Sequence, residues 1–91
     1  MWQLYIASSK AQKDWACLPP QVQQEIEQAL LANPYYDPSR PRARKHIKGK
    51  IRGKNRRCHR EYRRIEGGGR VFYAVDKENK QIRIEYVGPH P

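Results

Sequence analysis

Two strand-forming segments, separated by a short turn, lie near the end of the chain and restrict what it can fold into. They are RVFYAVD (residues 70–76) and QIRIEYV (residues 81–87), with KENK between them. Apolar side chains recur at every second position, which is typical of a strand with one buried face. The residues expected to share such a face are Val71, Tyr73 and Val75 in the first segment and Ile82, Ile84 and Tyr86 in the second. The sequence therefore predicts an antiparallel hairpin with one apolar face.

The beginning of the chain predicts a strand followed by a helix. WQLYI (residues 2–6) alternates in the same way as the later strands. Ser8 and Ser9 are good N-cap residues for a helix over KAQKDWACL (residues 10–18).

A second helix is predicted over QVQQEIEQALLA (residues 21–32). Pro20 suits its first turn, and Asn33-Pro34 ends it. The two helices form a helical hairpin with one apolar stripe. The residues of this stripe are Trp15, Leu18, Val22, Ile26, Ala29 and Leu30.

The middle of the chain is less regular. NPYYDPSRPRA (33–43) contains three prolines and is expected to be a loop, whereas RKHIKGKIRG (44–53) suits either a short edge strand or a loop. CHREYRRIE (58–66) indicates a strand of mixed polarity. The helical hairpin must bury its stripe on one sheet face. We therefore predict a single α+β domain over residues 1–91, with an N-terminal strand, a helical hairpin and a three- to four-stranded antiparallel sheet.

The positive charge of the chain is concentrated in one segment. Residues 40–64 contain thirteen of the nineteen Lys and Arg and one acid, Glu61, and so carry a net charge of +12. The remaining residues have six basic and eight acidic side chains, a net charge of −2. Such a patch points to a polyanion, most often nucleic acid. A solvated arm is the alternative, but Ile47, Ile51 and Tyr62 are residues that strands use.

The other composition signals exclude several classes of protein. Cys17 and Cys58 are too few and too far apart for a metal-ligand cluster, and nothing suggests a secreted, disulfide-linked protein. The first residues do not resemble a signal peptide, and no window has the length of apolar sequence that spans a membrane. We expect a cytoplasmic protein without a metal or other cofactor.

Four short motifs follow one another along the second half of the chain. IKG (47–49) comes first, RRI (63–65) and RVFYAV (70–75) flank a turn of glycines, and VGPH (87–90) ends the last strand. In this order, after a strand and a helical hairpin, they resemble the RelE/ParE toxin superfamily, above all its RelE and YoeB branches. RRI and RVFYAV, with the turn between them, resemble the sheet core of the family. IKG resembles its L-K-G stretch, and VGPH resembles its V-G-x-basic ending. The resemblance covers nearly the whole chain.

This resemblance implies a compact α+β fold, similar to that of small microbial ribonucleases, and a toxin of a type II toxin–antitoxin pair. In the RelE and YoeB branches, the toxin enters the ribosomal A site and cleaves mRNA. In the ParE branch, it poisons DNA gyrase and has no ribonuclease site. The partner implied by the family and by the charge of +10 is an acidic, partly disordered antitoxin that covers the basic face.

RNA cleavage by attack of the 2′-OH on the phosphate has three requirements. A base removes the 2′ proton, cations stabilise the charge on the phosphate oxygens, and an acid protonates the departing 5′ oxygen. The resemblance places Arg70 at the scissile phosphate, where a guanidinium can bind two oxygens. His90 falls at the C-terminal basic position of the family, although Pro91 replaces the final tyrosine of YoeB-like members. Arg63 and Arg64 match the YoeB Arg-Arg pair. Because they point to opposite faces of one strand, one of the two should lie beside Arg70.

The general base and the wider RNA contacts are less specific. YoeB-like members carry a glutamate shortly before L-K-G, where this chain reads PRARKH (41–46). Candidate bases are Lys48, which we include in the catalytic set, and Lys50, His46, His59, Arg63 and Glu61. Contacts to the RNA backbone are expected from Lys45, Lys50, Arg52, Lys54, Arg56 and Arg57. Tyr62 is either a stacking partner for a base or an ordinary aromatic of the sheet.

Three functions are compatible with this sequence. The first is a toxin that cleaves mRNA as a metal-independent endoribonuclease on the ribosome. The second is a ParE-like gyrase poison, against which Arg70 and His90 argue. The third is a basic RNA-binding module without enzymatic activity, which would bind RNA with a steep salt dependence.

Overall fold

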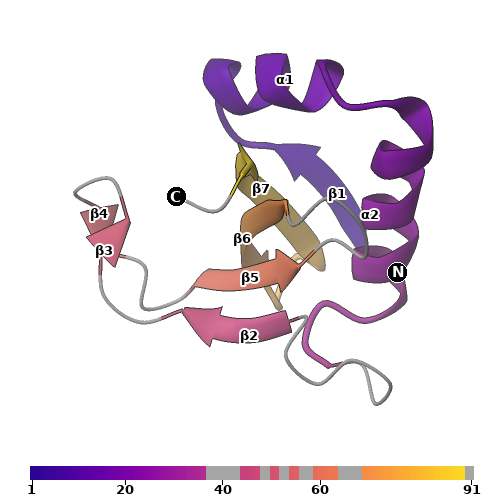
Figure 1. Cartoon of the computed structure of the whole chain (residues 1–91). Helices are drawn as coiled ribbons and strands as arrows, with labels where there is room; N and C mark the ends of the chain where they lie inside the picture. Colours follow the sequence, from indigo (N-terminus) through magenta and orange to yellow (C-terminus); the bar gives the residue numbers. More distant parts are fainter. Residues whose placement is uncertain (37–43, 48–49, 52–53, 56–58, 64–68, 90–91) are drawn as a thin grey trace.

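Two helices cover one face of a five-stranded sheet in the part of the chain that the computed structural model describes (Figure 1). That part comprises residues 1–36, 44–47, 50–51, 54–55, 59–63 and 69–89, with the backbone alone described for 44–47, 50–51, 54–55 and 59. The strand order in the sheet is β1-β7-β6-β5-β2. The α+β class is confirmed.

The helices begin and end close to where the sequence predicts. Helix α1 (Ser9–Ala16) is capped by Ser8, whose hydroxyl oxygen accepts a hydrogen bond from the Ala11 amide (3.1 Å). Helix α2 (Pro20–Ala32) begins at the proline and ends before Asn33-Pro34. The side chain of Gln23 donates to the carbonyl of Trp15 (2.8 Å), which also accepts from the Leu18 amide (3.0 Å), and so links α2 to the end of α1.

The sheet combines four antiparallel strands with one parallel strand. β2 (Arg44–Ile47), β5 (His59–Arg63), β6 (Arg70–Asp76) and β7 (Gln81–Gly88) pair antiparallel in that order, so the predicted four-stranded antiparallel sheet is confirmed. β1 (Gln3–Ile6) joins the far edge, parallel to β7. Two further short strands, β3 (Lys50–Ile51) and β4 (Lys54–Asn55), form a separate pair (Figure 1).

The hydrophobic core lies between the helices and one face of this sheet. Ile26 and Leu30 of α2 are fully buried, as the predicted stripe requires. The fully buried strand residues that share this cluster are Tyr62, Val71, Tyr73, Ile82 and Ile84. Val75 packs against it, which confirms the shared face expected for β6. The hydroxyl groups of the core residues Tyr62 and Tyr73 each donate a hydrogen bond, because a buried hydroxyl requires a partner.

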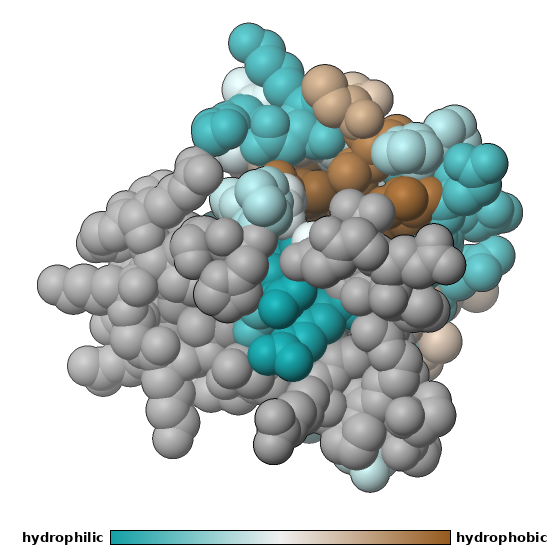
Figure 2. Space-filling model, in the orientation of Figure 1, coloured by the Kyte–Doolittle hydropathy of each residue, from teal (hydrophilic) through white to brown (hydrophobic). Residues whose placement is uncertain are grey.

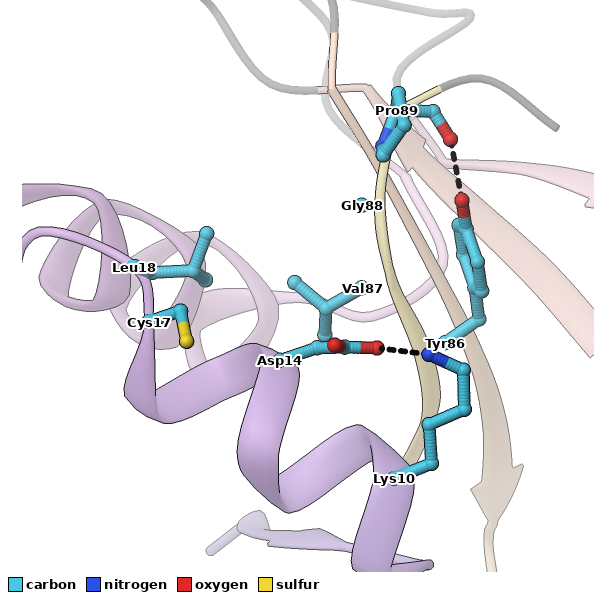
Figure 3. Close-up of a pocket in the computed structure, with 8 residues that line it drawn as sticks. All are labelled: Lys10, Asp14, Cys17, Leu18, Tyr86, Val87, Gly88 and Pro89. Atoms are coloured by element: carbon cyan, nitrogen blue, oxygen red, sulfur yellow. Dashed lines mark hydrogen bonds and ion pairs between the residues drawn. The ribbon is translucent and has the colours of Figure 1, made fainter.

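One prediction for β7 is wrong, because a β-bulge changes the alternation of its side chains. Phe72 pairs with Tyr86, but the next residue, Tyr73, pairs with Ile84, so Glu85 is the extra residue of the bulge. Beyond it, Tyr86 leaves the face of Ile84 and stacks on Phe72 in a separate cluster, with 5.1 Å between ring centroids. Figure 3 shows Tyr86 pointing away from α1 while the next residue points towards it.

The turn between β6 and β7 is an exposed hairpin connection, as KENK predicts. Asp76 accepts hydrogen bonds from the Asn79 amide (3.1 Å) and side chain (2.8 Å), and these contacts lower the pKa of its carboxyl. Neither of the helices that the structure describes is long and apolar enough to cross a membrane.

Removing the two buried tyrosine hydroxyls should cost different amounts of stability. The Tyr73 hydroxyl donates to the Pro34 carbonyl (2.6 Å) in the core, whereas the Tyr62 hydroxyl donates to the half-buried Glu25 carboxylate (2.7 Å). We expect Tyr73→Phe to lower the free energy of unfolding by about 1–3 kcal/mol and Tyr62→Phe by about 0.5–1.5 kcal/mol, because Glu25 is better placed to regain water. Urea denaturation of both variants measures this, and the reverse order would contradict it.

Candidate nucleic-acid interface

The hairpin of β5 and β6 places charged residues on the sheet face opposite the helices. Tyr62 and Val71 pair across the two strands and point into the core. Their neighbours must point the other way, because successive side chains of a strand alternate. On this open face, Arg63 pairs with Arg70 and Glu61 pairs with Phe72. The prediction that one arginine of the Arg63-Arg64 pair lies beside Arg70 is therefore confirmed for Arg63.

Glu61 forms an ion pair with Arg70 across this hairpin. The Arg70 Nε lies 2.7 Å from the Glu61 Oε1, and the two side chains are only 15% and 6% exposed. The Arg70 Nη1 also donates to the Gly69 carbonyl (3.2 Å). Two like charges directly opposite each other destabilise a strand pair. A carboxylate on the same face offsets the repulsion between Arg63 and Arg70.

The end of β7 forms the other neighbour of Arg70. Arg70 pairs with Gly88, and a Cβ at Gly88 would lie 2.9 Å from the Tyr86 hydroxyl oxygen. The hydroxyl in turn donates to the Pro89 carbonyl (2.6 Å). Glycine at position 88 therefore permits the ring of Tyr86 to lie along the strand, stacked on Phe72, beside the arginine pair.

A pocket of about 300 Å³ lies between α1 and the end of β7 (Figure 3). An ion pair between Lys10 and Asp14 (3.2 Å) lies on its helix side, and Tyr86 and Val87 belong to its strand side. Its lining combines apolar side chains with one exposed cysteine, Cys17, and shares Tyr86 and Gly88 with the surroundings of Arg70. The arginine pair, and not this pocket, has the charge that a phosphate requires.

Three of the predicted site residues have side chains that the structure describes. Arg70 and Arg63 come together on the open face, as expected. The prediction that Tyr62 stacks on an RNA base is wrong. The side chain is fully buried under α2, so no base can reach it, and Tyr62 is an ordinary aromatic of the sheet. Its position opposite Val71, in phase with the core, is the physical reason.

The backbone alone is described for three of the residues that are predicted to contact the RNA backbone. Lys45 in β2 pairs with Glu61, which places it in register with the ion pair. Lys50 and Lys54 lie in the separate pair of β3 and β4. The predicted residues that lie outside the described part of the chain are Lys48, Arg52, Arg56, Arg57, Arg64 and His90.

The ion pair that organises this site is not predicted from the sequence motifs. Glu61 is among the candidate bases but is not predicted as the partner of Arg70. The signal is present in the sequence, because Glu61 is the single acid of the basic segment and shares a strand face with Arg63 two residues later. Phe72 and Tyr86 were also missed, and the bulge that brings Tyr86 to this face has no such signal.

The visible surface is divided between hydrophobic and hydrophilic side chains. Figure 2, in the orientation of Figure 1, shows hydrophobic side chains gathered beside the helices and a hydrophilic area over the middle of the sheet. Arg60, on the helix side of β5, lies 4.9 Å from the ring centroid of Tyr35. Such a contact holds the cation at the edge of the core.

Solved structures share this fold. The chain is similar to one in the intact Escherichia coli RelBE toxin–antitoxin complex (19% identity, 100% of this chain and 99% of that chain, TM-score 0.63). It is also similar to a chain of the Mycobacterium tuberculosis RelBE2 toxin–antitoxin complex (19% identity, 98% of this chain and 98% of that chain, TM-score 0.67). A third match is the structure of an E. coli RelE variant, in which two arginines are replaced by alanine, with an antitoxin peptide (19% identity, 99% of this chain and 84% of that chain, TM-score 0.62). No family model and no curated protein matches the sequence. The chain therefore has a RelE-like fold.

Adding a methyl group at position 88 should disturb the aromatic pair beside Arg70. We expect Gly88→Ala to lower the free energy of unfolding by about 1–3 kcal/mol, because the new Cβ overlaps the Tyr86 hydroxyl. In a Tyr86→Phe background the same change should cost less, since the closest contact is removed. Urea denaturation of the four proteins gives this coupling, and additive effects would contradict the contact.

Proposed function

We propose that this chain is the toxin of a toxin–antitoxin pair and that it cleaves mRNA on the ribosome. The observation that carries the proposal is the arginine pair Arg63 and Arg70 on the open face of a RelE-like fold. Two guanidinium groups on neighbouring strands provide fixed positive charge for a phosphate and for the charge that develops on it. The basic segment before β5 supports binding to the RNA backbone of mRNA or rRNA.

The reaction assigned to this site is attack of a ribose 2′-OH on the adjacent phosphate. Arg70 contacts the phosphate, and Arg63 stabilises the additional negative charge of the transition state. His90 is the proposed acid for the departing 5′ oxygen, because imidazole gives up a proton near neutral pH. The products are a 2′,3′-cyclic phosphate and a 5′-hydroxyl end, with no metal or cofactor in the proposed reaction.

The proposed partner is an acidic antitoxin that binds the basic surface. Its negative charge complements a chain with a net charge of +10. The matched solved structures are toxin–antitoxin complexes, which supports a partner of this kind. A toxin that acts on translating ribosomes works in the cytoplasm.

Cleavage should depend on the guanidinium of Arg70 more than on its charge. Arg70→Lys keeps a cation near Glu61 but loses the forked geometry, so we expect mRNA cleavage to fall by about 100-fold. Arg83→Lys is the matched control, because Arg83 is an exposed arginine of β7 that pairs with Ala74, away from the arginine pair. Its cleavage rate should stay near that of the wild type.

The measurement is mapping of mRNA 5′ ends in a reconstituted translation reaction, with His90→Ala as a second loss-of-function variant. Full cleavage by both Arg70→Lys and His90→Ala would contradict the proposed site. Absence of cleavage by the wild type, together with DNA damage on expression, would favour a gyrase poison. RNA binding without cleavage or growth arrest would favour a binding module.

A further inference from the structure

Glu61 is an unusual residue for its surroundings. It is the one acid among thirteen basic residues in the segment 40–64, and its side chain is only 6% exposed. A buried carboxylate is costly unless a charged partner and hydrogen bonds compensate for the lost water. The Arg70 Nε at 2.7 Å is such a partner. The pair therefore explains why an acid is tolerated inside a basic face.

The contacts of Arg70 restrict the orientation of its guanidinium. Glu61 contacts Nε, and the Gly69 carbonyl accepts from Nη1 (3.2 Å). These contacts involve two different nitrogens of a planar group, so together they restrict rotation of that plane. A long arginine side chain otherwise loses many rotamers when it binds a phosphate. Orientation before binding removes that loss from the reaction.

The neighbouring arginine makes such a restraint necessary. Arg63 lies directly opposite Arg70 in the strand pair, and repulsion between the two cations would turn the guanidinium groups apart. Glu61 precedes Arg63 by two residues on the same strand face and therefore stands diagonally across from Arg70. Glu61 and Arg63 both lie in β5, so the attraction of Glu61 for Arg70 opposes the repulsion between Arg63 and Arg70.

We infer that Glu61 is a positioning residue that orients Arg70 for its phosphate, an inference that rests on the proposed function. Glu61 acts through Arg70 and does not take the 2′ proton. Its low exposure agrees with this role, because a general base must come within hydrogen-bond distance of the substrate hydroxyl. The role also predicts a specific cost: the carboxylate lowers the positive charge that attracts RNA.

Two variants separate orientation from charge and from proton transfer. Glu61→Gln keeps an oxygen beside the Arg70 Nε but is neutral, whereas Glu61→Ala removes that oxygen. Glu78→Gln is the matched control, because it makes the same charge change in the exposed turn after β6. Cleavage of mRNA, measured as kcat and KM over a range of pH, is compared with the unfolding temperature of each protein.

We expect Glu61→Ala to lower kcat by about 10- to 100-fold, because a misplaced group loses alignment with the reacting atoms. Its KM for RNA should stay equal or fall, since a negative charge is removed. Glu61→Gln should retain kcat within about threefold at every pH, because a polar oxygen of the same shape remains beside the Arg70 Nε. An equal loss of kcat in both variants, with an altered pH profile, would show a general base and overturn the inference, as would wild-type kcat in Glu61→Ala.

Nuclear magnetic resonance of the Arg70 Nε–H tests the orientation without any cleavage assay. This proton should exchange slowly with water in the wild type and in Glu61→Gln, and quickly in Glu61→Ala. Fast exchange in the folded wild type would overturn the inference. If Glu61→Ala does not fold, the exchange rates of this proton in the wild type and in Glu61→Gln still test the inference. A wild type that shows slow exchange but cleaves no mRNA would instead contradict the proposed function.

Discussion

The packing of α2 against the sheet determines which side chains of the β5–β6 hairpin remain for function. Ile26 and Leu30 are fully buried against a sheet face that includes Tyr62 and Val71. Because side chains alternate along a strand, burial of these two residues sends their neighbours to the other face. The arginine pair on the open face is thus a consequence of the hydrophobic core. A shift of the register by one residue would exchange the two sets.

The open face also depends on a balance of charge. Arg63 and Arg70 lie opposite each other, an arrangement that is unfavourable without an intervening anion. Glu61 supplies that anion at 2.7 Å from Arg70, mostly out of contact with water. Glu61 therefore lowers the positive charge of this face and in return gives the two cations a defined arrangement. Most of the positive charge of the chain lies instead in the segment before β5, and such a concentration of charge attracts polyanions at long range.

Much of the fold could be predicted because its signals are local. Ser8, Pro20 and Asn33-Pro34 mark the ends of the two helices through the chemistry of caps and of proline. The position of Arg70, out of phase with Val71, predicts its place on the open face. Tyr62 shows the limit of this reasoning. An aromatic residue in a mixed strand suits either face, and only pairing with Val71 under α2 decides between them.

The sequence by itself determined the two helices, the hairpin and the cluster of positive charge, because each depends on residue types at regular spacing. The tertiary structure alone decided the surroundings of Arg70. The bulge at Glu85 brings Tyr86 onto Phe72, and no regular pattern announces one extra residue in a strand. The partner of Glu61 likewise depended on strand pairing. A buried carboxylate must find a cation, and the register of β5 against β6 determines which cation is within reach.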